Sequence, residues 1–367
     1  MRIFALIIAM LLPFVLAATP QKKFATEHYD LVKVADGVYS FIAPESDSGL
    51  VLGNCTVIIG QESVLVFDTG QFPTLARSMV ADIRKLTPKP VRYIVNSHWH
   101  FDHVWGNAAF RVAYPEVVII STEFTRQMVE SEGPKTIGKQ PGVNAQEAAE
   151  LRKMIADGKL SDGRPVTPER KQELEHIVNT YERMNTELTL TVHTPPTVGF
   201  ERELTINLGG REVKILWLGR ANTAGDAVAW LPDEKLLLTG DAVVHPAPFA
   251  FGSYISEWPA VLQKMIDLHP SMIIPGHGGS VMHDTTYLAL LIETFQALFS
   301  QVKAAAAGGA SLDDVRKKVT LEEFKPRFIK LAATEGRGTS GFAMFLSGGV
   351  DRAYQEATGT LKPEGTE

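Results

Sequence analysis

The stretch IVNSHWHFDHVWGN, residues 94–107, places the side chains of His98, His100, Asp102 and His103 directly after an apolar run. The run itself, VRYIV, is typical of a buried β-strand. Side chains two residues apart on an extended strand end face the same side, so the first three of these groups are predicted to point one way and His103 another. Imidazole nitrogen and carboxylate oxygen are both ligands of zinc. The stretch therefore predicts a rigidly supported site for two metal ions, one on each side of the chain.

The N-terminal segment has the features of a secretory signal peptide in their usual order. Residues 1–18 begin with a positive Arg2, continue through an apolar run and end on the small residues Ala17 and Ala18. The apolar run is shorter than a membrane span needs, and Pro13 interrupts it, which weighs against an uncleaved membrane anchor. We therefore expect cleavage of the signal and a periplasmic or secreted protein without stable membrane insertion.

Composition restricts the partners of the chain. With 367 residues, of which 45% are hydrophobic, it can bury one large core or two small ones. Its formal net charge is -6 and no basic run is present, which argues against nucleic acid as a partner. Cys55 is the only cysteine, so no disulfide framework is expected. Because it lies in an apolar strand, Cys55 is predicted to be a core residue.

Two strand-rich halves, each with helical segments, predict an α/β fold with two central sheets flanked by helices. Expected strands of the first half lie within residues 54–60, 62–70, 91–98 and 116–122, with a helix over 74–87. Expected strands of the second half lie within residues 187–198, 202–210, 211–219, 227–232, 235–244 and 271–279, with helices over 257–268 and from 284 onward.

A polar stretch of about residues 123–186 separates the two halves and is predicted to be a helical insertion. Its amphipathic segments are residues 144–160 and 167–185, the second with Thr167 as N-cap. Two interpretations remain open, a surface addition and a lid over the site. The expected organisation is a signal peptide over 1–18, a catalytic domain over 19–300 that contains the insertion, and a C-terminal helical extension over 301–367. The tail from Lys362 is expected to fray.

The segment HWHFDH resembles the His-x-His-x-Asp-His signature of the metallo-β-lactamase superfamily. Further segments follow in the family's order, namely FDTG with Asp68, LGRANTAGD with Asp226, LLLTGD with Asp241 and IPGHGG with His277. Together they span about residues 54–279. The resemblance implies a four-layer αβ/βα sandwich with a two-metal site at the sheet edge.

The resemblance also implies a role for each site residue. The implied ligands are His98 and His100 for the first metal, Asp102, His103 and His277 for the second, and Asp241 as a bridge or as a completing ligand. Zinc is the implied metal, one or two ions per chain, with iron and manganese as alternatives. Asp68 is expected to hold a loop or a ligand histidine by hydrogen bonds.

One position departs from the family pattern. Where its members commonly have Gly-x-x-His-Thr, this chain reads GRANT, so Asn222 takes the place of the third ligand of the first metal. An amide oxygen is a weaker ligand for zinc than an imidazole. Three interpretations follow: one tightly held metal; two metals, with Asn222 as a weak ligand or with His245 moving in; or a site that has lost hydrolysis.

The function that the resemblance implies is hydrolysis by a metal-bound hydroxide, with Asp102 or Asp241 orienting the water and accepting its proton. The expected substrate is a small molecule with an amide, ester, lactone or thioester bond, and a β-lactam is one candidate. Alternatives are a non-catalytic metal- or ligand-binding protein with a decayed site, and an iron-dependent redox enzyme on the same fold.

Five aromatic side chains are candidates for the pocket wall, with core packing as the alternative role. They are Trp99, Phe101 and Trp105 beside the metal ligands, and Tyr254 and Trp258 in the second half.

Overall fold

The structure is a computed structural model that describes residues 23–25, 29–43, 52–161, 163–279 and 281–364. The predicted signal peptide lies outside these residues. Within the described part of the chain, no helix combines the length and the apolar character that crossing a membrane requires.

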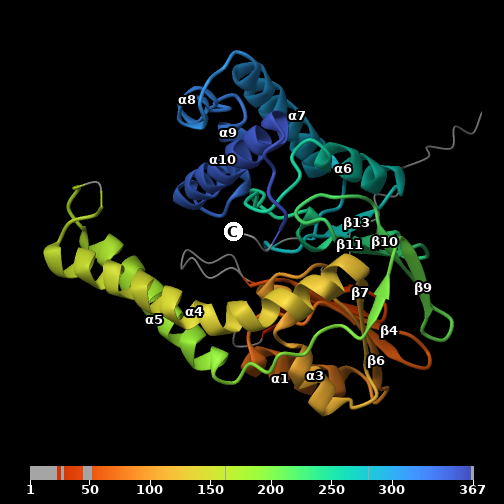
Figure 1. Ribbon diagram of the computed structural model, residues 1–367. Coiled ribbons are helices and arrows are strands. Elements are labelled where there is room, and N and C mark those ends of the chain that lie inside the picture. Colours follow the sequence, from red (N-terminus) through yellow and green to blue (C-terminus); the bar gives the residue numbers. More distant parts are fainter. Residues whose placement is uncertain (1–22, 26–28, 44–51, 162, 280, 365–367) are drawn as a thin grey trace, which may run out of the picture.

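Two β-sheets face each other in the centre of the molecule (Figure 1). The first has eight strands in chain order: β1 (Lys23–Ala25), β2 (Asp30–Ala35), β3 (Val38–Ile42), β4 (Cys55–Ile59), β5 (Val64–Phe67), β6 (Val91–Val95), β7 (Val118–Thr122) and β8 (Val198–Phe200). The second has five, in the order β13 (Met272–Ile274), β12 (Leu236–Leu238), β11 (Ala227–Leu231), β10 (Glu212–Trp217) and β9 (Glu203–Asn207). β5 to β8 are parallel, as are β12 and β13, and the other neighbours are antiparallel.

The strands at the centre bury both of their faces. In β5, Val64 and Val66 belong to the core beneath the outer helices, whereas Leu65 and Phe67 belong to the core between the two sheets. Alternate residues of a strand point to opposite faces, so a run that is apolar throughout is the pattern of a strand covered on both sides. Cys55 is fully buried in the first of these cores, as predicted.

Helices cover the outer face of each sheet and complete the four-layer αβ/βα sandwich (Figure 1). Met79 and Phe110 place α1 and α3 on the first sheet, and Leu291 and Phe345 place α7 and α10 against Leu237 of the second. The helices outside the insertion are α1 (Pro73–Leu86), α2 (Phe101–Val104), α3 (Asn107–Ala113), η1 (Gly240–Ala242), α6 (Trp258–Asp267), α7 (Thr286–Ala307), α8 (Leu312–Lys318), α9 (Lys325–Leu331) and α10 (Glu335–Thr358).

The predicted insertion forms two long helices, α4 (Glu123–Asp157) and α5 (Pro168–Leu188), which pack along each other and project beyond the sandwich (Figure 1). The predicted helix began only at Asn144, and Pro134 and Pro141, which precede that residue, would normally interrupt a helix. The helix nevertheless continues through both prolines. Its first turns are held by tertiary packing, with Val129 buried in an apolar cluster beside α2.

The second insertion helix begins as predicted, but the segment after it does not form the predicted strand. Thr167 is the N-cap of α5, and its side chain accepts a hydrogen bond from the backbone N–H of Arg170. The strand expected within residues 187–198 is wrong, because α5 continues to Leu188 and residues 189–197 form a connecting segment before β8. Alternating Thr and Leu there resemble the pattern of a strand. The hydroxyls of Thr189 and Thr191 instead donate hydrogen bonds to the backbone carbonyls of Thr186 and Glu187 at the end of α5.

Candidate metal centre

The loop after β6 carries the first group of site residues. β6 ends at Val95, and the short helix α2 begins at Phe101 with His100 as its N-cap. The prediction that Asp102 points to the same side as His98 is therefore wrong. The two-residue alternation of an extended strand stops at the helix, and Asp102 turns toward the side of His103.

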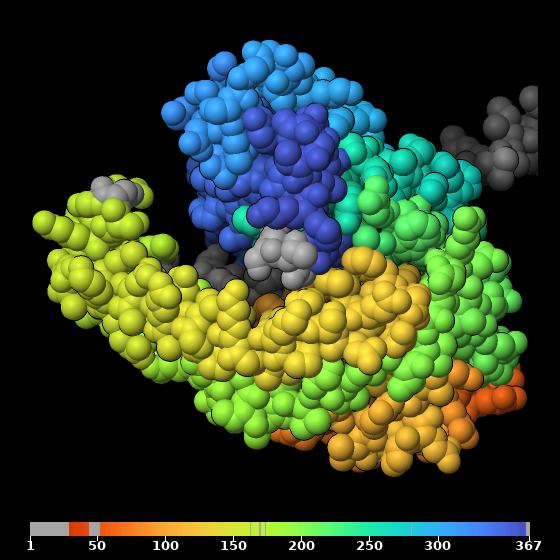
Figure 2. All heavy atoms as spheres, viewed as in Figure 1, coloured from red at the N-terminus to blue at the C-terminus, as the bar shows by residue number. Residues whose placement is uncertain are grey.

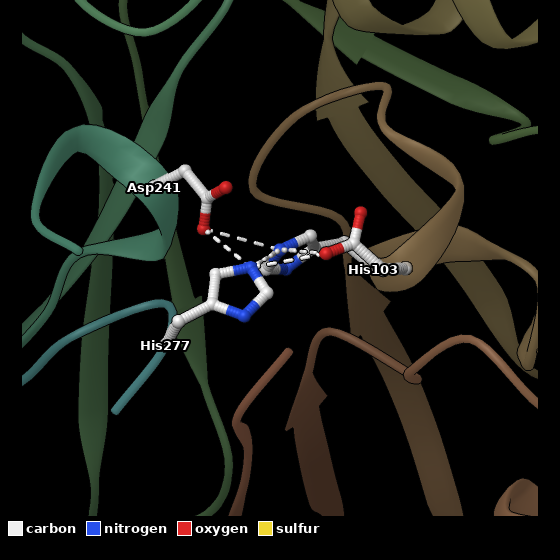
Figure 3. A group of neighbouring side chains, drawn as sticks. His103, Asp241 and His277 are labelled. Carbon is white, nitrogen blue, oxygen red and sulfur yellow. Dashed lines mark hydrogen bonds and ion pairs between the residues drawn. The ribbon is translucent and has the colours of Figure 1, made fainter. Parts of the chain in front are cut away.

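Four donor atoms from both halves of the molecule converge at one point (Figure 3). Nε2 of His103 lies 3.1 Å from Nε2 of His277 and 3.1 Å from Oδ1 of Asp241. Nε2 of His277 lies 3.2 Å from Oδ1 of Asp241 and 3.0 Å from Oδ2 of Asp102, and the latter is 3.5 Å from Nε2 of His103. We call Asp102, His103, Asp241 and His277 the four-residue group.

A second set of donors shares Asp241. His98, His100 and Asp241 each offer an atom within 4.8 Å of the others. Oδ2 of Asp241 lies 3.6 Å from Nε2 of His98, whereas its Oδ1 faces the four-residue group. The structure thus places Asp241 between two clusters, which is the geometry of a bridging carboxylate.

Asp68 holds histidines of both clusters. Its Oδ2 lies 2.8 Å from Nδ1 of His103 and accepts a hydrogen bond from the hydroxyl of Ser97 at 2.7 Å, while its Oδ1 accepts from the backbone N–H of Ser97. The Ser97 oxygen in turn lies 2.9 Å from Nδ1 of His98. Because the Ser97 proton goes to Asp68, that oxygen accepts from His98. Both imidazoles therefore carry their proton on Nδ1 and turn the Nε2 lone pair inward. This is the positioning role expected for Asp68.

Tight turns in the second half position its two metal-ligating residues, Asp241 and His277. Nδ1 of His277 lies 3.0 Å from the carbonyl oxygen of Leu52 and donates to it, so Nε2 is again the inward atom. A Cβ atom on Gly276 would lie 2.2 Å from Oδ1 of Asp241. Only glycine permits this approach, which explains why glycines flank both donors in the sequence.

The charges of the four-residue group balance one another. Burial disfavours a charged imidazole, but the neighbouring carboxylates outweigh it: they raise the pKa of His103 well above its usual value and that of His277 to about 9. Burial also disfavours charged carboxylates, yet the same imidazoles hold the pKa of Asp102 at about 2 and that of Asp241 well below its usual range. The carboxylates thus favour two positive charges at this point, and a divalent cation would supply them in place of the two Nε2 protons.

The arrangement fits a divalent metal such as zinc. Ligand atoms about 2.0 to 2.1 Å from a tetrahedral zinc are roughly 3.3 Å apart, and the five distances given above for the four-residue group are 3.0 to 3.5 Å. In the other cluster, Nε2 of His98 is buried without a hydrogen-bond partner, and burial lowers the pKa values of His98 and His100. Neutral imidazoles with a free lone pair are the form that binds metal.

Asn222 is fully buried, and neither its amide oxygen nor its amide nitrogen has a hydrogen-bond partner. Its loop is closed by Asp226, which accepts from the backbone N–H of Thr223 at 2.7 Å and from its hydroxyl at 2.9 Å. A buried amide without partners normally costs free energy, so this position has the character of a polar site built for a ligand. His245 belongs to neither cluster among the residues that the structure describes.

A cavity of about 770 Å³ opens onto the metal centre, with His100, Asp102, Asp241 and His277 in its wall. The pocket prediction holds for the aromatic residues of the first half, since Trp99, Phe101 and Trp105 all line this cavity. The other two take the alternative role, core packing. Trp258 is fully buried and stacks on Phe295 with ring centroids 4.5 Å apart, and Tyr254 packs beneath Arg220.

Other parts of the cavity wall were not predicted. α4 and α5 of the insertion contribute residues such as Val129 and Met184, so the insertion does form part of the site. The tail expected to fray also contributes Glu364, whose carboxylate accepts hydrogen bonds from Nε1 of Trp99 at 2.8 Å and from the backbone N–H of Ala224 at 2.6 Å. A lone glutamate among polar tail residues gives no local signal of these long-range contacts.

The chain resembles known proteins over most of this region. The family model of the metallo-β-lactamase superfamily matches residues 48–277. The chain is 21% identical over 286 residues to the metallo-β-lactamase type 2 of Bacteroides fragilis. This match covers 76% of this chain and 90% of that protein. It is 24% identical over 242 residues to the linear primary-alkylsulfatase of a Pseudomonas species, covering 61% of this chain and only 41% of that longer relative.

Solved structures agree in fold. A metallo-β-lactamase from Pontibacter korlensis aligns with a TM-score of 0.51 at 18% identity, covering 73% of this chain and 99% of the other. The DIM-1 metallo-β-lactamase aligns with a TM-score of 0.50 at 16% identity, covering 73% and 97%. At these identities the likeness establishes the sandwich and says nothing of the substrate.

Proposed function

The chain belongs to the metallo-β-lactamase superfamily, and we propose that it is a metal-dependent hydrolase that opens an amide, ester, lactone or thioester bond of a small molecule. One observation carries the proposal: Asp241 lies between two donor clusters at the wall of a cavity, and the four-residue group has the spacing of a tetrahedral site. The relatives named above, a β-lactamase and an alkylsulfatase, are hydrolases, which supports the same reaction class.

The proposed ligands divide as the clusters do. His98, His100 and the Asn222 amide would hold one metal, less tightly because an amide oxygen is a weaker ligand than an imidazole. The four-residue group would hold the other, and Asp241 would serve both. Zinc is the proposed metal. When bound, such a metal lowers the pKa of coordinated water toward about 7 and polarises the bond under attack.

The chain's own groups would handle the proton and the orientation. Asp102 and Asp241 both line the cavity and both have lowered pKa values, so each is ionised at neutral pH. A lowered pKa makes a carboxylate a weaker base, so their main role would be to orient the attacking water while it loses its proton. Asp68 and Ser97 keep the Nε2 atoms of His98 and His103 turned toward the metals. Trp99, Phe101 and Trp105 limit the access of bulk water on one side.

We also propose that the protein is exported to the periplasm or secreted, on the basis of the signal-like residues 1–18. N-terminal sequencing of the protein purified from its native host tests this. A mature chain that starts just after Ala17 or Ala18 supports export, and a chain that retains Arg2 contradicts it.

The central experiment measures hydrolysis by the mature protein after its metal has been stripped and again after zinc has been restored. The substrates are a chromogenic β-lactam, an aryl ester, a lactone, a thioester and an alkyl sulfate. A rate that returns with zinc for at least one of the four non-sulfate bonds, and that Asp102→Ala abolishes, supports the proposal. Hydrolysis of the sulfate alone, or no zinc-dependent hydrolysis at all, overturns it.

A further inference from the structure

We propose that the substrate is a fatty acyl ester, whose apolar chain lies in the cavity while its ester group meets the metal centre. This inference rests on the proposed hydrolase function and names the substrate class of that site. In the reaction, the oxygen of water bonds to the acyl carbon, the bond from that carbon to the alcohol oxygen breaks, and the alcohol leaves with a proton.

The cavity is large enough for such a chain and begins at the metal centre. Its volume of about 770 Å³ is in the upper part of the usual range for small-molecule pockets. His100, Asp102, Asp241 and His277 are among the residues that line it, and α4, α5 and α10 contribute further parts of the wall. In Figure 2 the surface is hollowed between the yellow α4 and the blue α10.

The cavity is elongated along α4. Val129 and Val143 both line it and are 14 residues apart, which corresponds to about 21 Å of helix. Gly133, Thr136 and Gln140 line it between them, at the spacing of three to four residues that keeps side chains on one face. A long wall of this kind accommodates a linear chain better than a compact bicyclic ring.

Apolar side chains line the cavity both next to the metal centre and at exposed positions, beside polar side chains of α4 such as Glu132, Lys135 and Lys139. Phe249 lies next to His100, with ring centroids 6.4 Å apart, and Phe251 packs against Phe249. Farther out, Val143 and Met344 line the cavity although 40% and 52% of their surfaces are exposed.

These exposed apolar groups are clustered. Nine large apolar side chains are strongly exposed in the described part of the chain, and five of them line this one cavity: Val143, Val192, Phe249, Phe251 and Met344. Isolated exposed apolar residues need no explanation, whereas a group around one opening indicates a surface that an apolar ligand covers.

The first test compares the zinc-restored protein on aryl esters of acetate, butyrate, octanoate and dodecanoate. Burying each methylene is expected to raise kcat/KM about three- to fourfold until the chain fills the cavity, so that dodecanoate exceeds acetate by on the order of a hundredfold or more. Acetate hydrolysis without any rise along the series overturns the inference and leaves the hydrolase proposal standing.

Variants locate the effect. The double variant Val143→Asn, Met344→Asn adds polar groups at the mouth, at exposed positions where folding tolerates them, and is expected to reduce the dodecanoate-to-acetate ratio about tenfold. Val112→Asn is the matched control, because Val112 is 83% exposed but does not line the cavity. An equal reduction in the double variant and in Val112→Asn overturns the assignment of the acyl chain to this cavity.

A binding measurement separates the two proposals. Calorimetric titration with dodecanoate, with acetate as the control ligand, is expected to show saturable binding with a negative heat-capacity change, weakened in the double variant. Such binding without hydrolysis of any ester supports the apolar cavity and overturns ester hydrolysis. Absence of dodecanoate binding overturns the inference whatever the activity.

Discussion

The substitution Asp68→Asn tests whether one buried carboxylate orients both metal clusters. Asp68 is fully buried and receives three hydrogen bonds, from the backbone and hydroxyl of Ser97 and from Nδ1 of His103. Asparagine has nearly the same shape and keeps an acceptor for the Ser97 backbone. Its amide nitrogen, however, is a donor and meets the Ser97 hydroxyl and His103 Nδ1, which are donors as well.

The expected losses of metal affinity and of stability follow from the two hydrogen bonds that change. A hydrogen bond to a charged group contributes about 1.5 to 3 kcal/mol, and part of the loss is recovered when the hydroxyl rotates and His103 changes tautomer. That tautomer carries its proton on Nε2, the atom 3.1 Å from Asp241 that must bind the metal. We expect metal affinity to fall about 10- to 100-fold, or about 1.4 to 2.8 kcal/mol, and the metal-free protein to lose about 2 kcal/mol of its free energy of unfolding.

Metal affinity is measured by competition with a chromogenic chelator, and stability by urea unfolding of the stripped protein. Asp36→Asn is the control, because this fully exposed carboxylate pairs with Lys33 on the surface and belongs to neither donor cluster, and it should match the native protein in both assays. Metal affinity of Asp68→Asn within twofold of the native value would refute the orienting role.

Three further substitutions probe other parts of the centre. Asn222→His restores an imidazole and is expected to raise the metal content of purified protein from near one toward two per chain by elemental analysis; two tightly held metals in the native protein would contradict this. Gly276→Ala places a Cβ atom 2.2 Å from Oδ1 of Asp241 and should lower zinc-dependent kcat/KM by about a hundredfold or more, whereas unchanged kinetics would show that the turn relaxes freely. Glu364→Ala removes the acceptor for Trp99 and is expected to raise KM several-fold and shift the tryptophan emission, with Glu364→Gln, which keeps one acceptor oxygen, falling between. An emission spectrum identical to that of the native protein would show that the tail does not hold Trp99.

Local sequence determined most of the elements and the chemistry of the loop after β6, but not the helix over 123–143 or the connection over 189–197. Apolar runs such as Val64–Phe67 predict strands buried on both faces, because neighbouring residues of a strand point to opposite faces and all of these are apolar. The glycine before His277 in the sequence is the residue that allows the turn to approach Asp241 closely, as the clearance at Gly276 shows. The closely spaced histidines and aspartates pointed to a metal site because few other functions require those groups together.

Local periodicity did not decide which groups meet, although the family resemblance implied the grouping that the structure shows. Asp102 joins His103 instead of His98 because a helical turn begins at Phe101, and a helix start depends on the packing of α2 as much as on its own residues. The first half of α4 forms despite Pro134 and Pro141 because its contacts compensate for the missing backbone bonds. The cavity wall, from the insertion to Glu364, joins residues far apart in the chain. No local pattern specifies such contacts, since they arise only when both sheets and the C-terminal helices have packed.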